Sequence, residues 1–138
     1  MGTRSLIKIK DDKKTILCIY QQYDGSLGGV GLDIYNILNH GRSEIINEFS
    51  GIDASPDKFN GMGCLATFLL ARIKLNQSRT IGGVYIYPPS AEREEYNYTL
   101  TDKNGIIYMR VTDWSNKVLY NDKLNNFRKH ITNLERAV

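Results

Sequence analysis

A glycine-rich turn is the first feature of this sequence that could do chemistry. It reads Phe59-Asn60-Gly61-Met62-Gly63-Cys64 and stands at the start of a long apolar stretch. Glycines at a helix start let backbone N–H groups converge on an anion, and the helix dipole favours negative charge there. The turn therefore predicts a phosphate or carboxylate site. The structural alternative is that Asn60 caps the helix while the glycines permit close packing.

The end of the second predicted strand is the other candidate. It reads Tyr20-Gln21-Gln22-Tyr23-Asp24-Gly25, and a chain that leaves a strand through glycine can approach a ligand closely. Asp24 could accept a hydrogen bond from a ribose hydroxyl or act as a base, and Arg4 could supply positive charge. The structural alternative is ordinary turn chemistry at Asp24-Gly25, with the tyrosines packed in a sheet.

Cys64 raises the question of nucleophilic catalysis. The helix dipole favours the thiolate form of a cysteine in a first turn, so Cys64 could attack a substrate. It also shares a predicted helix face with buried leucines, where a free cysteine usually acts as a small hydrophobic residue. The two histidines, His40 and His130, stand at a predicted helix end and on a predicted surface face. No catalytic residue, metal site or cofactor is therefore assigned.

Local patterns predict the elements that would position these residues. Alternating and β-branched residues indicate a hairpin of residues 5–10 and 15–23. Asn104-Gly105 signals a tight antiparallel turn further along the chain, whereas residues 42–58 fit either a strand or a helical turn. Extended segments are also predicted at 82–87, 96–102, 106–113 and 117–120, and helices at 30–39, 61–76 and 122–136.

The predicted fold class is α+β. We expect a mainly antiparallel sheet, a buried central helix and a C-terminal amphipathic helix, all in a single domain of residues 1–138. The helix over 61–76 is expected to be buried because apolar side chains fill most of its circumference. Tyr85 and Tyr87 make one face of a strand aromatic, and they are expected to pack under a helix, although they could instead line a ligand pocket.

The charge pattern argues against a nucleic-acid partner. Eighteen basic and fifteen acidic residues give a net charge of +3, and the two signs are interspersed, as in residues 8–14. A nucleic-acid footprint normally appears as a strongly basic patch with aromatic residues beside it. Interspersed charge is more typical of a solvated surface.

Cysteine usage and the N-terminus indicate a soluble intracellular protein. Cys18 and Cys64 are too few for a disulfide framework, and the sequence has no Cys-x-x-Cys pair. The N-terminus reaches a charge at Arg4 and only short apolar runs follow. Neither a signal peptide nor a membrane span is therefore expected.

Four pieces of the chain carry a resemblance. They are Met1-Gly2-Thr3-Arg4-Ser5, Tyr20-Gln21-Gln22-Tyr23-Asp24-Gly25, Phe59-Asn60-Gly61-Met62-Gly63-Cys64 and Gly82-Gly83-Val84-Tyr85-Ile86-Tyr87-Pro88. Together they resemble an uncharacterised family of small proteins of bacteria, phages and large DNA viruses. The resemblance implies a viral or phage setting, with the host cytoplasm as the expected compartment and the nucleus or the virion as alternatives. It also implies that the four pieces belong to one fold. It supplies no catalytic residue.

The leading hypothesis is a non-enzymatic protein that binds a small anionic or nucleotide-like ligand. Its predicted ligand-binding residues are Arg4, Gln22, Asp24, Asn60, Gly61, Gly63 and Cys64. One rival is a protein-interaction module that forms a homodimer and acts on a host protein through its surface. The other rival is a hydrolase or transferase that uses Cys64 or Asp24.

Overall fold

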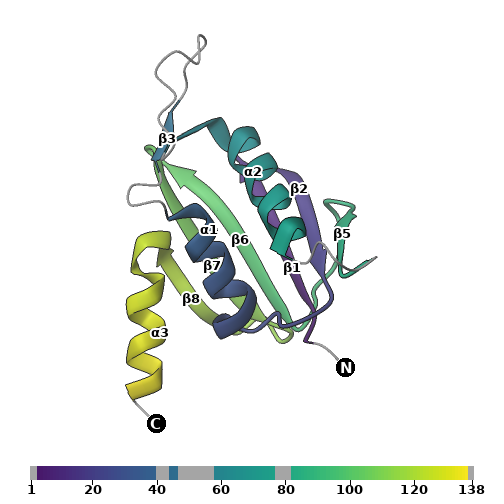
Figure 1. The fold of residues 1–138 in the computed structure, drawn as a ribbon, viewed down its shortest axis with the longest axis vertical. Coiled ribbons are helices and arrows are strands. Elements are labelled where there is room, and N and C mark those ends of the chain that lie inside the picture. The colour runs from purple at the N-terminus through teal and green to yellow at the C-terminus, as the bar shows by residue number, and fades with distance from the viewer. Residues whose placement is uncertain (1–2, 40–43, 47–57, 77–81, 137–138) are drawn as a thin grey trace.

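In the part of the chain that the structure describes, eight strands form one sheet, and three α-helices pack beside it (Figure 1). The computed structural model describes residues 3–39, 44–46, 58–76 and 82–136. The strands are β1 (Ser5–Asp11), β2 (Lys14–Gln21), β3 (Glu44–Ile46), β4 (Lys58–Asn60), β5 (Val84–Tyr87), β6 (Tyr96–Lys103), β7 (Ile106–Asp113) and β8 (Val118–Lys123). The helices are α1 (Leu32–Leu38), α2 (Gly61–Asn76) and α3 (Phe127–Arg136), with a π-helical turn at Leu27–Gly31 and a 3-10 turn at Leu124–Asn126.

The sheet is mixed but mainly antiparallel, so the predicted α+β class is confirmed. Its strand order is β4-β3-β7-β6-β1-β2-β5, and β8 pairs with β7 outside this path. β1 lies inside the sheet, antiparallel to β2 and parallel to β6. The start of β1 and the end of β2 therefore lie at the same end of the sheet, and the turn between β6 and β7 lies at the opposite end.

Local turn signals in the sequence predicted two of the strand pairs correctly. β1 and β2 form the predicted hairpin. Asn104 and Gly105 join β6 to β7 with φ values of 54° and 84°, the left-handed backbone that a tight hairpin turn needs. The prediction for the last helix was wrong at its start, because Asp122 belongs to β8 and α3 begins at Phe127. β8 extends that far because Lys123 still pairs with Tyr108.

The hydrophobic core lies between the sheet and helices α1 and α2, which pack on one of its faces (Figure 1). Side chains of a strand alternate between its two faces, and Ile7 and Ile9 on β1 are completely buried in this core. α2 contributes one side to the core, namely Met62, Leu65, Ala66, Leu69 and Ile73. Its opposite side, including Thr67 and Arg72, is exposed. α3 lies beside β8 and adds Phe127 and Ile131.

We call the other side of the sheet the open face, because none of the described helices covers it. Leu6, Cys18 and Tyr20 form a separate small cluster here, against Tyr87 and Ala91. The expectation that Tyr85 and Tyr87 pack under a helix was wrong. Their register places them opposite Tyr20 and Cys18, and Tyr87 stacks on Tyr20 with ring centroids 4.5 Å apart.

The connection from β2 to α1 is packed tightly against the sheet. Tyr98 on β6 is fully buried and donates a hydrogen bond of 2.7 Å from its hydroxyl to the Gly25 carbonyl oxygen. The Val30 N–H donates to the Asp24 carbonyl oxygen at 2.8 Å, which closes the turn before α1. A Cβ atom on Gly29 would lie 2.1 Å from that same oxygen. The glycine at position 29 is therefore required by space.

None of the helices among the described residues is both long enough and apolar enough to cross a membrane.

This packing predicts that alanine substitutions at two adjacent glycines have different effects on stability. Gly29→Ala should lower the free energy of unfolding by about 3 kcal/mol, because the new methyl group collides with backbone. Gly28→Ala is the matched control: nothing lies within 4 Å of its Cβ position, so its stability should change by less than about 1 kcal/mol. Urea unfolding of both variants measures the difference. Equal stability of the two would contradict this account of the turn.

Candidate functional site

The structure does not bring the seven predicted ligand-binding residues into one site. Arg4, Gln22 and Asp24 lie where β1 begins and β2 ends. The Gln22 N–H donates to the Gly83 carbonyl oxygen at 2.9 Å, and Lys74, in the last turn of α2, donates to the neighbouring Gly82 carbonyl oxygen at 3.0 Å. This end of the sheet therefore adjoins the C-terminal end of α2.

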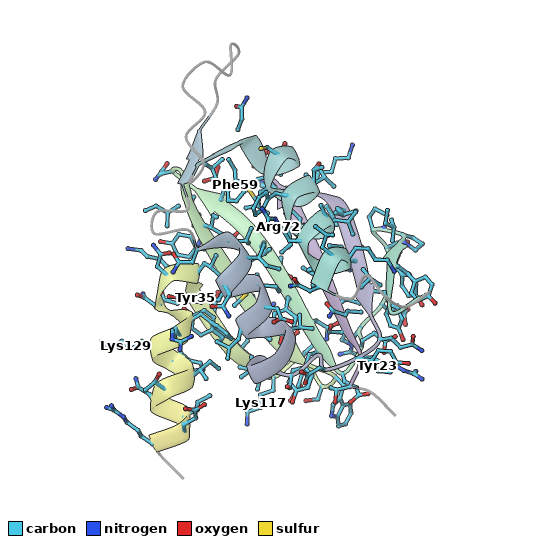
Figure 2. The ribbon with its side chains drawn as sticks, viewed as in Figure 1. Tyr23, Tyr35, Phe59, Arg72, Lys117 and Lys129 are labelled. Carbon is cyan, nitrogen blue, oxygen red and sulfur yellow. The ribbon has the colours of Figure 1, made fainter. Side chains whose placement is uncertain are left out.

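The glycine-rich turn lies at the other end of α2. Gly61, with φ of 81°, begins the helix directly after β4, and the rise from Gly61 to Lys74 is about 20 Å for an α-helix. Phe59, which precedes Asn60, and Tyr23, which lies between Gln22 and Asp24, are well apart in Figure 2. A small ligand cannot contact both halves, so the predicted composite site is not formed.

Even at the strand end, the Arg4 and Asp24 side chains face different surroundings. Burial raises the pKa of Tyr20, on the open face, and the positive charge of Arg4 partly opposes that shift. Asp24 instead packs against Gly29. Burial, followed by the Asp24 charge, raises the pKa of Asp33 in α1. Arg4 thus acts on the open face, while Asp24 acts on the helix side.

The structure corrects the interpretation of Cys64 as a buried residue. It lies exposed in the first turn of α2, whereas Cys18 is buried. His130 packs between Tyr120 and Phe127, with its ring centroid 4.9 Å from that of Tyr120, on the side of the sheet that carries α3. The described residues therefore include no Cys64–His130 pair. Nor do they include any group of three or more His, Cys, Asp and Glu residues that could hold a metal ion.

A groove of about 520 Å³ runs along the open face. Its floor comes from β1 and β6, its wall from the connection between β5 and β6, and its end from the turn between β7 and β8. The lining residues are Leu6, Lys8, Ser90, Ala91, Glu92, Arg93, Asn97, Tyr98, Thr99 and Asn116. We call this the open-face groove. Its volume falls in the range of small-molecule sites.

Specific hydrogen bonds hold the wall of the open-face groove. The Lys8 ammonium group donates to the Ala91 carbonyl oxygen at 2.8 Å, reaching from the floor to the wall. The Asn97 side chain makes a pair of bonds with Glu94: its oxygen accepts from the backbone N–H and its amide donates to the carbonyl oxygen, both at 2.9 Å. These contacts fix the wall over β1 and β6, so the groove exists without a ligand.

Asn116 reaches the groove because Asp113 organises the turn between β7 and β8. One carboxylate oxygen of Asp113 accepts from the Ser115 N–H at 2.8 Å, the Ser115 hydroxyl at 2.7 Å and the Lys117 N–H at 3.0 Å. The Ser115 hydroxyl is the main reason that the pKa of Asp113 is lowered. Asn116 itself has φ of 68°, a backbone that asparagine tolerates well.

Strand alternation sorts the charges of the sheet by face. Pairing places Lys8, Thr99, Arg110 and Asn121 in one row across the open face. The next row runs from Thr101 through Tyr108 to Lys123. Lys103 also lies on this face, with its ammonium 4.8 Å from the centre of the Tyr108 ring, and Lys10 has the same parity on β1 as Lys8. The acidic residues of these strands, Asp11, Asp102, Asp113 and Asp122, occupy the alternate positions.

The chain matches no protein-family model, no curated protein and no solved structure. The resemblance to the viral and bacterial family therefore stays a prediction, and functional inference rests on the geometry of the site.

Sequence reasoning missed the open-face groove and its basic neighbours. Lys8 and Lys10 alternate with Ile7 and Ile9, and this pattern could have placed both lysines on one face of the strand. No local signal shows that β1 pairs with β6, which is more than eighty residues away in the sequence. The groove depends on that long-range pairing, since its floor is shared between the two strands.

The two thiols should differ sharply in reactivity. Cys64 is exposed and should react with Ellman's reagent in the folded protein. Cys18 is buried, and its burial raises the pKa of its thiol, so it should react only when the protein unfolds. Stopped-flow absorbance on the native protein should therefore show one fast equivalent, which is absent in Cys64→Ser. Two equally fast equivalents would contradict the placement of Cys18 under the β5–β6 connection.

Proposed function

We propose that this protein is a non-enzymatic binding protein for an anionic or nucleotide-like ligand, and that the ligand occupies the open-face groove. The observation that carries the proposal is the placement of two cations, Lys8 on the floor and Arg93 on the wall, around a preformed hollow of about 520 Å³. Among the described lining residues, Glu92 is the one acidic residue.

The other lining groups suit a polar ligand with an anionic end. Thr99 and Ser90 offer hydroxyl groups, and Asn116 offers an amide that can donate and accept. Leu6 adds a small apolar area to the floor. Hydrogen bonds to charged groups contribute about twice as much as neutral ones, so Lys8 and Arg93 would anchor the anion while the hydroxyl and amide groups orient the remainder of the ligand.

Two other locations support this ligand less well. A helix rise of about 20 Å separates the N-terminal turn of α2 from Lys74, at the end of the helix that adjoins the predicted strand-end partners. The turn could therefore offer an anion only its own backbone N–H groups. A smaller hollow of about 290 Å³ lies between α1 and α2, and it contains Asp33 as well as Arg72. The Arg72 guanidinium already lies 5.0 Å from the centre of the Phe68 ring. The open-face groove is therefore the better site.

The setting of this function is also a proposal. The free thiols of Cys18 and Cys64 support an intracellular compartment, and the family resemblance supports a viral or phage origin. Nothing in the groove resembles a catalytic constellation, since the described lining residues include no paired nucleophile and base. We therefore favour binding over hydrolysis or group transfer.

Anion binding in the groove should depend on Arg93. Isothermal titration with inorganic phosphate and a panel of nucleotides should find at least one ligand, and Arg93→Gln should weaken it roughly tenfold, because a charge-assisted hydrogen bond is lost. Thr99→Val should weaken a nucleotide less. Lys129→Gln is the matched control, since Lys129 lies exposed on α3 (Figure 2), a helix that contributes no described lining residue to the groove.

Two results would contradict the groove as the site. One is unchanged affinity in Arg93→Gln and in Lys8→Gln. The other is loss of affinity in Asn60→Ala with the groove variants unaffected, which would return the ligand to the N-terminal turn of α2.

The edge of the sheet favours a second candidate function, that of a dimeric interaction module. β5 is an edge strand, and Ile86 and Tyr85 on it are 67% and 46% exposed. Unpaired edges are templates for pairing with another chain, so a second copy or a host protein could add a strand beside β5.

A dimer through this edge should be sensitive to charge at Ile86. If the protein is dimeric by light scattering, Ile86→Lys should raise the dissociation constant at least tenfold, since a charge at the centre of a strand-pairing interface is poorly tolerated. Leu75→Lys is the matched control: Leu75 on α2 is 63% exposed but belongs to no strand. A monomer at all concentrations would remove this candidate.

A further inference from the structure

We infer that the open face binds single-stranded nucleic acid, with the open-face groove holding one nucleotide of a strand that continues across β6, β7 and β8. This inference rests on the proposed function, because it identifies the anionic ligand of the groove as part of a polymer.

The charge of the open face is the first argument. The charged side chains described on this face of β1, β6, β7 and β8 are all basic: Lys8, Lys10, Lys103, Arg110 and Lys123. Arg110, Lys103 and Lys123 are exposed. The net charge of +3 does not reveal this basic surface, because the acidic residues of the same strands stand at the positions of the other face. A polyanion is the partner that this surface complements.

An aromatic ring between the cations is the second argument. Tyr108 pairs with Lys123, and the Lys103 ammonium lies 4.8 Å from its ring centre. Sheet platforms that bind single strands combine such cations with aromatic side chains on which bases stack. The contact with Lys103 is exposed and therefore weak, so a base can displace the ammonium and free it for a phosphate.

The shape and polarity of the face are the third argument. β1, β6, β7 and β8 span about 14 Å at the usual strand spacing, which suits two or three nucleotides on a sheet platform. Thr99, Thr101 and Asn121 stand between the cations and can hydrogen-bond to base edges. Acyl chains of a lipid would gain nothing from these groups, so we favour a nucleic acid over an anionic membrane.

One acidic side chain of the described lining, Glu92, borders the groove end of this path. Glu92, Glu94 and Glu95 belong to the connection between β5 and β6, and Glu94 is close enough to Tyr20 to raise its pKa further. That connection covers the part of the open face nearest β2 and β5, through Ala91 and its contacts with Leu6, Cys18 and Tyr20. The rows that contain Arg110 and Tyr108 lie on the opposite side of the groove.

The test is fluorescence anisotropy with labelled twelve-nucleotide dT and rU oligomers, on the full chain, over a range of salt concentrations. Arg110→Gln/Lys123→Gln should weaken binding at least tenfold and reduce the slope of log K against log salt by about 1.4, as two phosphate contacts require. Arg128→Gln/Lys129→Gln is the matched control on α3 and should change neither quantity. Tyr108→Ala should weaken binding roughly tenfold, whereas Tyr108→Phe should preserve it.

The outcomes separate this inference from the proposed function. Phosphate or nucleotide binding that depends on Arg93, without oligomer binding, overturns the inference and leaves the function intact. Absence of all binding overturns both. Equal loss in the α3 control overturns the inference. So does equal affinity for a twelve-base-pair DNA duplex, or binding to phosphatidylserine vesicles without binding to the oligomers. Every basic residue replaced in these oligomer variants is exposed. Thermal unfolding of each variant checks that it folds.

Discussion

Coverage of the sheet on one side only is the constraint on which the rest of this structure depends. A strand presents alternate side chains to its two faces, and α1 and α2 pack on one of those faces. Apolar residues such as Ile7, Ile9 and Leu100 must therefore share that parity along their strands, and they are completely buried. The remaining parity is free to carry polar and charged groups. A shift of one residue in any pairing would exchange the two sets.

The same constraint explains why the acidic residues of the strands do not neutralise the open face. Asp102, Asp113 and Asp122 all stand close to strand ends, where they accept backbone hydrogen bonds in the turns that follow. The backbone N–H of Lys123 is the main reason that the pKa of Asp122 is lowered, with the Asn126 amide second. These carboxylates act as acceptors near the strand ends and at the start of α3, and they stand at the parity opposite to that of the basic residues.

Local chemistry could be predicted from the sequence, and long-range pairing could not. The left-handed turn is formed by two adjacent residues, Asn104 and Gly105, and this turn sets the hairpin of β6 and β7. The parallel pairing of β1 with β6 depends on a match between distant segments, which leaves no local signal. The prediction of a composite site was wrong for the same reason. Asp24 follows the end of β2 and Asn60 directly precedes α2, but the length of α2 separates them. Cys64 was misplaced because apolar residues on both sides of α2 obscured which side is buried.

Charge patterning shows the same limit in a form that bears on function. Along the chain, Lys8 and Lys10 precede two aspartates, and Lys103 follows Asp102, so the signs look mixed. In the sheet, neighbours in sequence point to opposite faces, and residues with the same parity on adjacent strands become neighbours. Arg110 and Tyr108 then lie across from Thr99 and Thr101. The aspartates of β6 and β7, Asp102 and Asp113, stand at the alternate positions, which belong to the other face. An interspersed sequence is therefore compatible with a basic face whenever the intervals between like charges are even. For a sheet protein, the argument from interspersed charge against a polyanionic partner holds only after the register is known.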